Sequence, residues 1–191
     1  MIAKRHPQRG SALLEGVLMI PILFATLLTA AQLFGVQLAA TRLEQAAHSL
    51  AAVLAEQPRI DQRSLNALID QAANPQDIGN VEIVINVVSG EKELARTPIY
   101  RGNAQGECPT LSEGSQWGGS LPETLATPTG SNNQQARESN VPWLVVVQVC
   151  RSGSDLTLGT PLIGAKQLQV SSTLRMAYGP WEEMDTIPSR L

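Results

Sequence analysis

The chain has 191 residues, a formal net charge of −3 at pH 7 and only 16% charged side chains. A chain of this length has room for one modest globular domain beside a membrane segment. The acidic balance leaves no basic field beyond the first ten residues, so the composition argues against nucleic acid as a partner.

A long apolar stretch dominates the start of the chain. Between Gly10 and Ala40 the only charged residue is Glu15, and the stretch is longer than the roughly 20 residues that a helix needs to cross a bilayer core. We therefore expect one membrane-spanning helix in contact with lipid. The basic residues of the preceding segment, residues 1–10, predict a cytoplasmic N-terminus, with the rest of the chain outside, because short basic flanks are retained on the cytoplasmic side.

Glu15 is the unusual residue of this stretch, because a carboxylate within a membrane helix is costly and generally marks a functional contact. It lies five residues after Gly10, at the junction between a basic leader and a long apolar helix. This arrangement resembles the prepilin signal of type IV pilins and pseudopilins. The resemblance implies that a prepilin peptidase cuts after Gly10 and leaves Ser11 as the mature N-terminus, with Glu15 at the fifth mature position.

Such a cut would create a new positive charge close to the acid. The α-ammonium of Ser11 can neutralise the Glu15 carboxylate within an apolar environment, on its own or on a neighbouring subunit. A secretory signal peptide is disfavoured, since its apolar region has only about 7 to 15 residues. An uncleaved signal anchor with an incidental acid remains open as an alternative.

The helix is expected to continue beyond the membrane. Leu43, Ala47, Leu50 and Leu54 extend an apolar stripe at helical spacing, and Pro58 ends it. We predict one long helix over residues 11–57, embedded in the membrane to about residue 40, followed by an outer domain over residues 58–191. The fold class is α+β, with the long helix half in the membrane and half packed on the outer domain.

The outer domain is predicted to contain one short helix and a small, mainly antiparallel sheet. The helix covers about 61–73, with Asp61 or Ser64 as its cap. A strand over 81–88 alternates in polarity, which places Glu82 and Asn86 on a solvent face. An extended piece over 97–101 is expected to pair with this strand.

Two further strands are predicted near the end of the chain. The nearly continuous apolar run 144–150 indicates a central strand covered on both faces. The run 168–177 alternates and has one wet face. The tail after Tyr178 is expected to be extended and partly mobile.

The long segment 102–140 shows no regular pattern and is rich in Gly, Ser, Thr, Pro, Asn and Gln. Segments of this length are either functional or disordered. Trp117 lies within it, and packing over the sheet is favoured over a contact with a neighbouring subunit.

The two cysteines, Cys108 and Cys150, both fall on the predicted outer side, where disulfides persist. A bridge between them would close a loop of about forty residues and contribute about 4 kcal/mol. The alternatives are two free thiols or a metal site, and a metal site would need further ligands that the sequence does not supply.

No catalytic, cofactor or metal-binding motif is apparent in the sequence. His48 is expected on the surface of the long helix, and the acid pairs 91/93 and 182/183 on solvated surfaces. The sequence therefore predicts neither an enzyme nor a cofactor, and no small-molecule substrate.

Sequence runs near the two ends of the chain resemble one particular family of pseudopilins. The run Arg-Gly-Ser-Ala-Leu-Leu-Glu-Gly-Val-Leu-Met-Ile-Pro, with Gln-Leu-Phe-Gly downstream, is similar to the start of TadE/TadF-like minor pseudopilins of the tight-adherence (Tad, or Flp) pilus. Val-Val-Val-Gln-Val at 145–149 and Val-Ser-Ser-Thr-Leu-Arg-Met at 170–176 resemble that family's C-terminal strand pair. The matched parts cover about half of the chain, whereas the middle, residues 59–141, carries no family motif.

This resemblance implies a structural subunit of the bacterial inner membrane. Its partners would be the prepilin peptidase, other Tad pilins and pseudopilins, and the inner-membrane assembly platform. The alternative is an uncleaved single-pass envelope protein that binds a ligand or a secretion component. A membrane-anchored envelope enzyme is a third, weaker alternative.

Overall fold

The structure is a computed structural model that describes residues 11–122, 141–153, 167–181 and 187–190. Within these ranges it describes every side chain except those of residues 11–15, 75 and 77. The chain divides into two compact units, residues 1–38 and 39–191. Each unit is treated by itself below.

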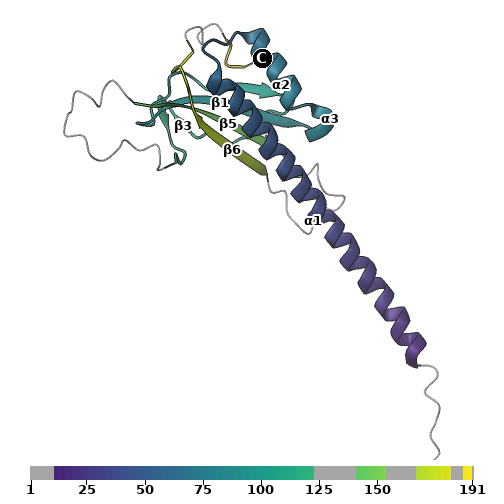
Figure 1. The fold of residues 1–191 in the computed structure, drawn as a ribbon. Coiled ribbons are helices and arrows are strands. Elements are labelled where there is room, and N and C mark those ends of the chain that lie inside the picture. The colour runs from purple at the N-terminus through teal and green to yellow at the C-terminus, as the bar shows by residue number, and fades with distance from the viewer. Residues whose placement is uncertain (1–10, 123–140, 154–166, 182–186, 191) are drawn as a thin grey trace, which may run out of the picture. The chain divides into compact units, whose positions relative to one another are not determined.

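Helix α1, Ser11–Glu56, runs for 46 residues and confirms the predicted long N-terminal helix (Figure 1). At 1.5 Å per residue its length is about 70 Å. The helix continues through Pro21 and ends just before Gln57 and Pro58, in agreement with the stop signal in the sequence.

The second unit contains a four-stranded antiparallel sheet with the strand order β2-β1-β5-β6. Its strands are β1 (Val81–Ser89), β2 (Ile99–Gly102), β5 (Trp143–Arg151) and β6 (Leu168–Arg175). Two very short strands, β3 (Ser112–Glu113) and β4 (Gln116–Trp117), form a separate hairpin. The predicted pairing of the 97–101 segment with the first strand is confirmed, and β5 is central, as expected.

One face of the sheet packs against helices. Ile83 and Ile85 of β1 and Val147 of β5 belong to the main core, together with the second half of α1 and with helix α2 (Gln62–Ala72). The α1 residues of this core recur at helical spacing: Leu43, Ala46, Ala47, Leu50, Ala51, Leu54 and Ala55. The stripe that the sequence predicted is therefore the stripe that the helix buries.

Helix α2 confirms the short helix predicted after α1. Asp61 is its N-cap, and the carboxylate of Asp61 accepts a hydrogen bond from the Ser64 N–H at 3.1 Å. Leu65 and Ile69, four residues apart, are its buried positions. A four-residue helix, α3 (Pro75–Ile78), which the sequence analysis did not predict, follows α2.

The prediction that β1 has a solvent face is wrong. All nine residues of β1 are buried, including Glu82 and Asn86. The reason is a cover formed by the irregular segment after β2: Cys108 packs near Val84, and Trp117 of β4 packs with Val88 and Val146. The prediction that Trp117 packs over the sheet is thereby confirmed.

Strand β6 shows the expected alternation in part, because Gln169, Ser171 and Arg175 are exposed, whereas Thr173 is half-buried like Leu174. The tail after Tyr178 is predicted to be partly mobile, but two of its described residues are buried. Trp181 and Ile187 are buried in the main core, and the Trp181 indole N–H donates to the Gln57 carbonyl at 3.1 Å. Two apolar side chains of the tail are therefore part of the core of the second unit.

Candidate functional site

The residues implied in processing and assembly lie at the start of the chain. Gly10 falls outside the described residues. Ser11 and Glu15 belong to the first part of α1, and their side chains also fall outside the described part. The predicted contact between the Glu15 carboxylate and a chain-terminal amine therefore stays a prediction.

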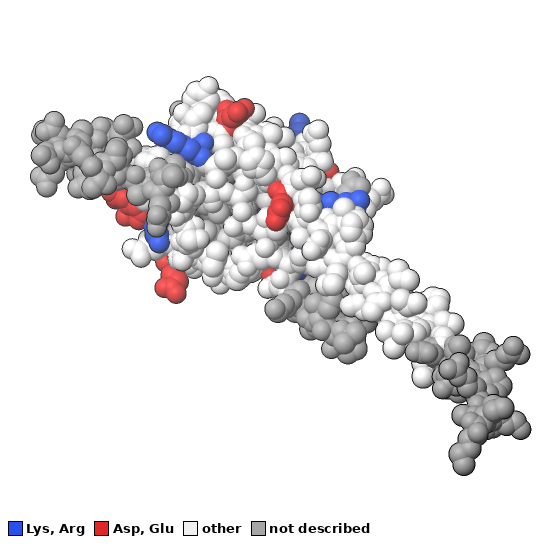
Figure 2. All heavy atoms as spheres, turned by 60° about the horizontal axis from the view of Figure 1, so that its bottom comes forward, with Lys and Arg blue, Asp and Glu red and all other residues white. Residues whose placement is uncertain are grey.

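The apolar part of α1 is exposed and carries no charge. The large apolar side chains from Val17 to Leu38 are 44–69% exposed, except that of Val36, which is half-buried. By length and composition this is the one helix in the described part of the chain that could span a membrane. Figure 2 shows no Lys, Arg, Asp or Glu along this part of α1, whereas charged side chains are scattered over the second unit. Exposed apolar surfaces of this kind are typical of segments that contact a membrane or another protein.

The structure brings the two cysteines together. The sulfur atoms of Cys108 and Cys150 are 2.01 Å apart, and their Cα atoms are 5.2 Å apart. The Cys108 N–H also donates to the buried Glu82 carboxylate at 2.7 Å. The disulfide and this hydrogen bond fasten the irregular segment after β2 to the central strands.

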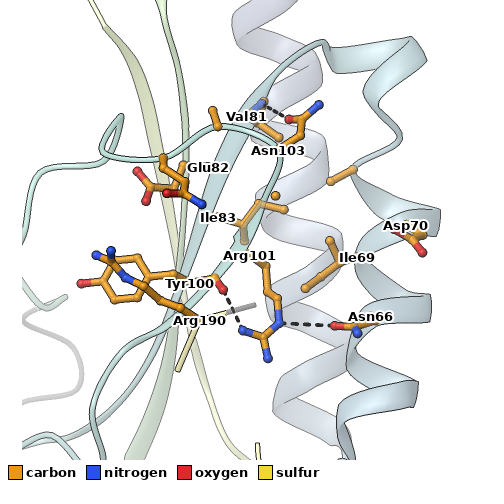
Figure 3. Close-up of a pocket in the computed structure, with 14 residues that line it drawn as sticks. Asn66, Ile69, Asp70, Val81, Glu82, Ile83, Tyr100, Arg101, Asn103 and Arg190 are labelled. Carbon is orange, nitrogen blue, oxygen red and sulfur yellow. Dashed lines mark hydrogen bonds between the residues drawn. The ribbon is translucent and has the colours of Figure 1, made fainter. Parts of the chain in front are cut away.

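A pocket of about 360 Å³ lies at the β2 edge of the sheet, between β2 and α2 (Figure 3). Its lining includes Asn66 and Asp70 of α2, Tyr100 and Arg101 of β2, and Arg190 near the end of the chain. This volume is within the range of small-ligand sites in proteins, about 300–1,000 Å³.

Arg101 is the most unusual residue of this pocket, because its side chain is only 6% exposed. Its guanidinium donates to the Asn66 side-chain oxygen at 3.3 Å, to the Tyr100 carbonyl at 2.7 Å and to the Pro188 carbonyl at 3.0 Å. All three acceptors are uncharged. Burial, followed by the positive charge of Arg96, lowers the pKa of Arg101 from its ordinary value.

Two other arginines lie around the same end of the chain. Arg190 stacks on the Tyr100 ring, with its guanidinium carbon 4.7 Å from the ring centre. Arg96 donates to the Ile187 carbonyl, and its other terminal nitrogen is buried without a partner among the described residues. Arg96 and Arg101 thus both donate to segment 187–190, and Arg190 belongs to that segment.

The sequence analysis did not single out this pocket. A signal was nevertheless present in the sequence. Ile99 and Arg101 are two residues apart in β2, so their side chains lie on the same face of the strand, and Ile99 is buried. An arginine at an apolar position of a strand indicates a buried cation. The polar groups that it meets come from α2 and from the chain end, and strand periodicity does not predict these.

Some of the expected surface residues are where the sequence placed them. His48 is exposed on α1, and Glu91 and Glu93 are exposed in the turn after β1. The pair 182/183 lies outside the described residues. No group of three or more His, Cys, Asp or Glu that could hold a metal ion occurs in the part of the chain that the structure describes.

Comparison with known proteins identifies no relative: no family model, no curated protein and no solved structure matches the chain.

Proposed function

We propose that the chain is a minor pseudopilin, a structural and assembly subunit of a Tad (Flp) type IV pilus, held in the bacterial inner membrane by α1. In this proposal a prepilin peptidase cuts after Gly10, and the chain then begins at Ser11. The observation that carries the proposal is the uninterrupted helix α1, which exposes large apolar side chains between Val17 and Leu38. The helix follows the leader-like segment 1–10 in the sequence, and Glu15 is its one charged residue before Arg42.

Assembly would rest on two physical terms. The exposed apolar side chains between Val17 and Leu38 can pack against lipid or against the equivalent helices of other subunits. Glu15 would pair with a Ser11 amine, and removal of one partner from a buried ion pair costs about 3–5 kcal/mol. The pair would therefore select correctly placed neighbours, because a misplaced helix leaves its carboxylate without a cation.

Processing is tested by N-terminal sequencing of the chain from membranes with and without the prepilin peptidase. We expect Ser11 as the first residue when the peptidase is present, and Met1 when it is absent. Gly10→Ala should give Met1 in both strains. A wild-type chain that begins with Met1 in the presence of the peptidase would reject the processing step.

Assembly is tested separately with Glu15→Ala. We expect the variant to be cut normally and to reach the membrane, but to be lost from sheared pili or from the complex with the assembly platform. Glu44→Ala, which changes an exposed acid in the second half of α1, is the matched control and should assemble like the wild type. Normal incorporation of Glu15→Ala would contradict the proposed ion pair.

A second candidate function is an uncleaved single-pass envelope protein that binds a ligand. The pocket beside Arg101 is the observation that favours it. Intact-mass measurement of the membrane-extracted chain separates the two candidates, since only the pseudopilin lacks residues 1–10.

A further inference from the structure

The four-stranded sheet has two outer sides, and segments outside the sheet bond to one of them. On the β2 side, the Tyr100 N–H donates to the Ser189 carbonyl at 2.7 Å. On the same side, the Ala95 N–H donates to the Val87 carbonyl of β1 at 2.8 Å. The chain thus covers the β2 side of the sheet with its own backbone. The opposite outer strand is β6.

The register of β6 shows which of its backbone groups face away from β5. The Met176 N–H, just after β6, donates to the Trp143 carbonyl of β5 at 2.8 Å. In an antiparallel pair, hydrogen-bonded residues recur at every second position. The even-numbered residues of β6 therefore bond to β5, and the backbone groups of its odd-numbered residues point outward: Gln169, Ser171, Thr173 and Arg175.

These outward groups form an open strand edge. Within the described part of the chain, no residue hydrogen-bonds to the backbone of the four outward residues. Edge strands are normally protected by short length, a bulge, Lys or Pro. Strand β6 is eight residues long, pairs with β5 without a bulge and contains neither Lys nor Pro. Its outer edge is therefore competent to pair with another strand.

The side chains of β6 define the chemistry of a matching strand. Val170 and Leu174 pack against the main core but are only half-buried, so part of each apolar side chain stays accessible. On the other face Gln169 and Ser171 are exposed, and Arg175 is the one charged residue of β6. Side chains that lie opposite each other in paired strands interact. A matching strand therefore alternates apolar and polar residues and places an acid opposite Arg175.

A second copy of the chain is a poor match for this edge. The second half of α1 runs beside β6 in the same direction. The His48 Nδ1 lies 3.5 Å from the Ser172 Oγ, and further along both elements the Ala177 N–H donates to the Ala55 carbonyl. Two β6 strands paired antiparallel about a two-fold axis would therefore direct their α1 helices oppositely, whereas two chains held in one membrane by these helices need them parallel.

We propose that the outer edge of β6 binds an extended strand of a different protein by β-strand addition. The backbone groups of Gln169, Ser171 and Thr173 supply hydrogen bonds, and Val170 and Leu174 contact the apolar residues of the bound strand. This binding does not depend on processing at the start of the chain or on the ion pair proposed there.

The test uses the full ¹⁵N-labelled chain in detergent micelles and follows backbone N–H exchange with heavy water by NMR. The probe is acetyl-Glu-Val-Thr-Val-Thr-Val-Glu-amide, which alternates as proposed and carries acids. One control peptide has Thr in place of each Val, and a second has Lys in place of each Glu. A third has the probe sequence with all its backbone nitrogens methylated. Salt is kept constant, since it screens charge interactions.

In the free chain, the outward N–H groups of Ser171 and Thr173 should exchange at least about tenfold faster than those of Ser172 and Leu174, which bond to β5. The probe should slow exchange of the outward pair saturably. The Thr and Lys peptides should bind more weakly, and the methylated peptide should not bind. Slow exchange of the outward pair without probe, or no effect of the probe up to about 1 mM, would overturn the proposal.

A pair of variants tests backbone pairing from the side of the chain. Ser171→Pro removes one outward N–H, and Pro is tolerated where the N–H of an edge strand faces solvent. This variant should bind the probe at least about tenfold more weakly. Ser171→Ala keeps the N–H and is the matched control, so it should bind like the wild type. Equal affinity of the two variants would reject backbone pairing, and the methylated peptide makes the same test on an unchanged chain.

Sedimentation of the full chain in detergent, without probe and at several concentrations, tests the alternative of a second copy. We expect a monomer whose Ser171 N–H exchanges rapidly at every concentration. A dimer that forms as the concentration rises, and that protects this N–H, would show that β6 pairs with itself. The proposal of a different protein as the partner would then fail.

Discussion

At the scale of single residues, the two central strands each bury an amide side chain, and only that of Asn86 was predicted to face solvent. Asn86 of β1 and Gln148 of β5 are 2% and 1% exposed. Their side-chain nitrogen and oxygen atoms have no hydrogen-bond partner within the described structure. Burial of an unsatisfied polar group costs about 1–3 kcal/mol, so these amides are expected to reduce the stability of the sheet.

Asn86→Val should therefore raise the free energy of unfolding by about 1 kcal/mol, since it removes two unsatisfied atoms and adds a β-branched side chain to a strand. Thermal unfolding of the full chain in detergent, followed by tryptophan fluorescence, measures the change. Val146→Asn, at the position paired with Asn86, is the opposite control and should lower the midpoint. A less stable Asn86→Val protein would show that the native amide does have a partner.

At the scale of elements, the start of α2 contains a pH-dependent cap. Hydrogen bonds from the side chain and then the backbone N–H of Ser64 lower the pKa of Asp61 below its ordinary value of 3.8. A carboxyl group whose pKa is lower in the folded than in the unfolded state stabilises the fold above the unfolded pKa. That contribution is lost as the pH falls from about 4 through the folded-state pKa.

We expect the unfolding midpoint of the wild type to fall more steeply below pH 4 than that of Asp61→Asn, because Asn caps a helix without titrating. Above pH 5 the two proteins should respond to pH in parallel. Thermal unfolding between pH 2 and pH 7 measures this difference. Identical pH profiles throughout would mean that the Asp61 carboxylate does not contribute as an ionised cap.

The disulfide also acts at the scale of elements, because it joins Cys150 of β5 to Cys108 in the irregular segment after β2, 42 positions away in the sequence. Replacement of both Cys108 and Cys150 by Ala should lower the free energy of unfolding by about 4 kcal/mol, the loop-closure value for this separation. Denaturant unfolding compares the double variant with the wild type, with and without reductant. Reductant should lower the stability of the wild type only. Equal stability of the variant and the wild type without reductant would contradict the bridge.

At the scale of the whole molecule, the chain combines a compact disulfide-linked unit, residues 39–191, with an exposed apolar helix segment. Leu27 and Leu28 are 67% and 62% exposed within that segment. Two arginines at a helix centre disfavour membrane insertion by about 5 kcal/mol or more. The double variant Leu27→Arg/Leu28→Arg should therefore lose the membrane-bound fraction that resists alkaline extraction.

The matched control for this experiment is Gln45→Arg/Ser49→Arg. Both positions are exposed in the second half of α1, beyond the predicted membrane segment, so the control should remain as resistant to extraction as the wild type. Equal extraction of wild type and both variants would mean that this stretch does not hold the chain in a membrane.

The sequence by itself determined the elements with strong local periodicity. Helix α1, helix α2 and the strand character of β1 and β6 follow from residue spacing, because the period of a helix or strand is a property of neighbouring residues. The continuous apolar run of β5 likewise indicated a buried strand. Which of Asp61 and Ser64 caps α2 was decided by the structure. The candidate span is likewise evident in sequence, since it depends only on the length and composition of one apolar segment.

Only the tertiary structure decided which faces are covered and which distant residues meet. Glu82 and Asn86 read as solvent-facing because they alternate with apolar residues, yet the segment around Cys108 and Trp117 buries them. Arg101 meets Asn66 and Pro188, which lie 35 and 87 positions away. Contacts at such separations depend on how the chain returns to the sheet, and no local pattern encodes that return.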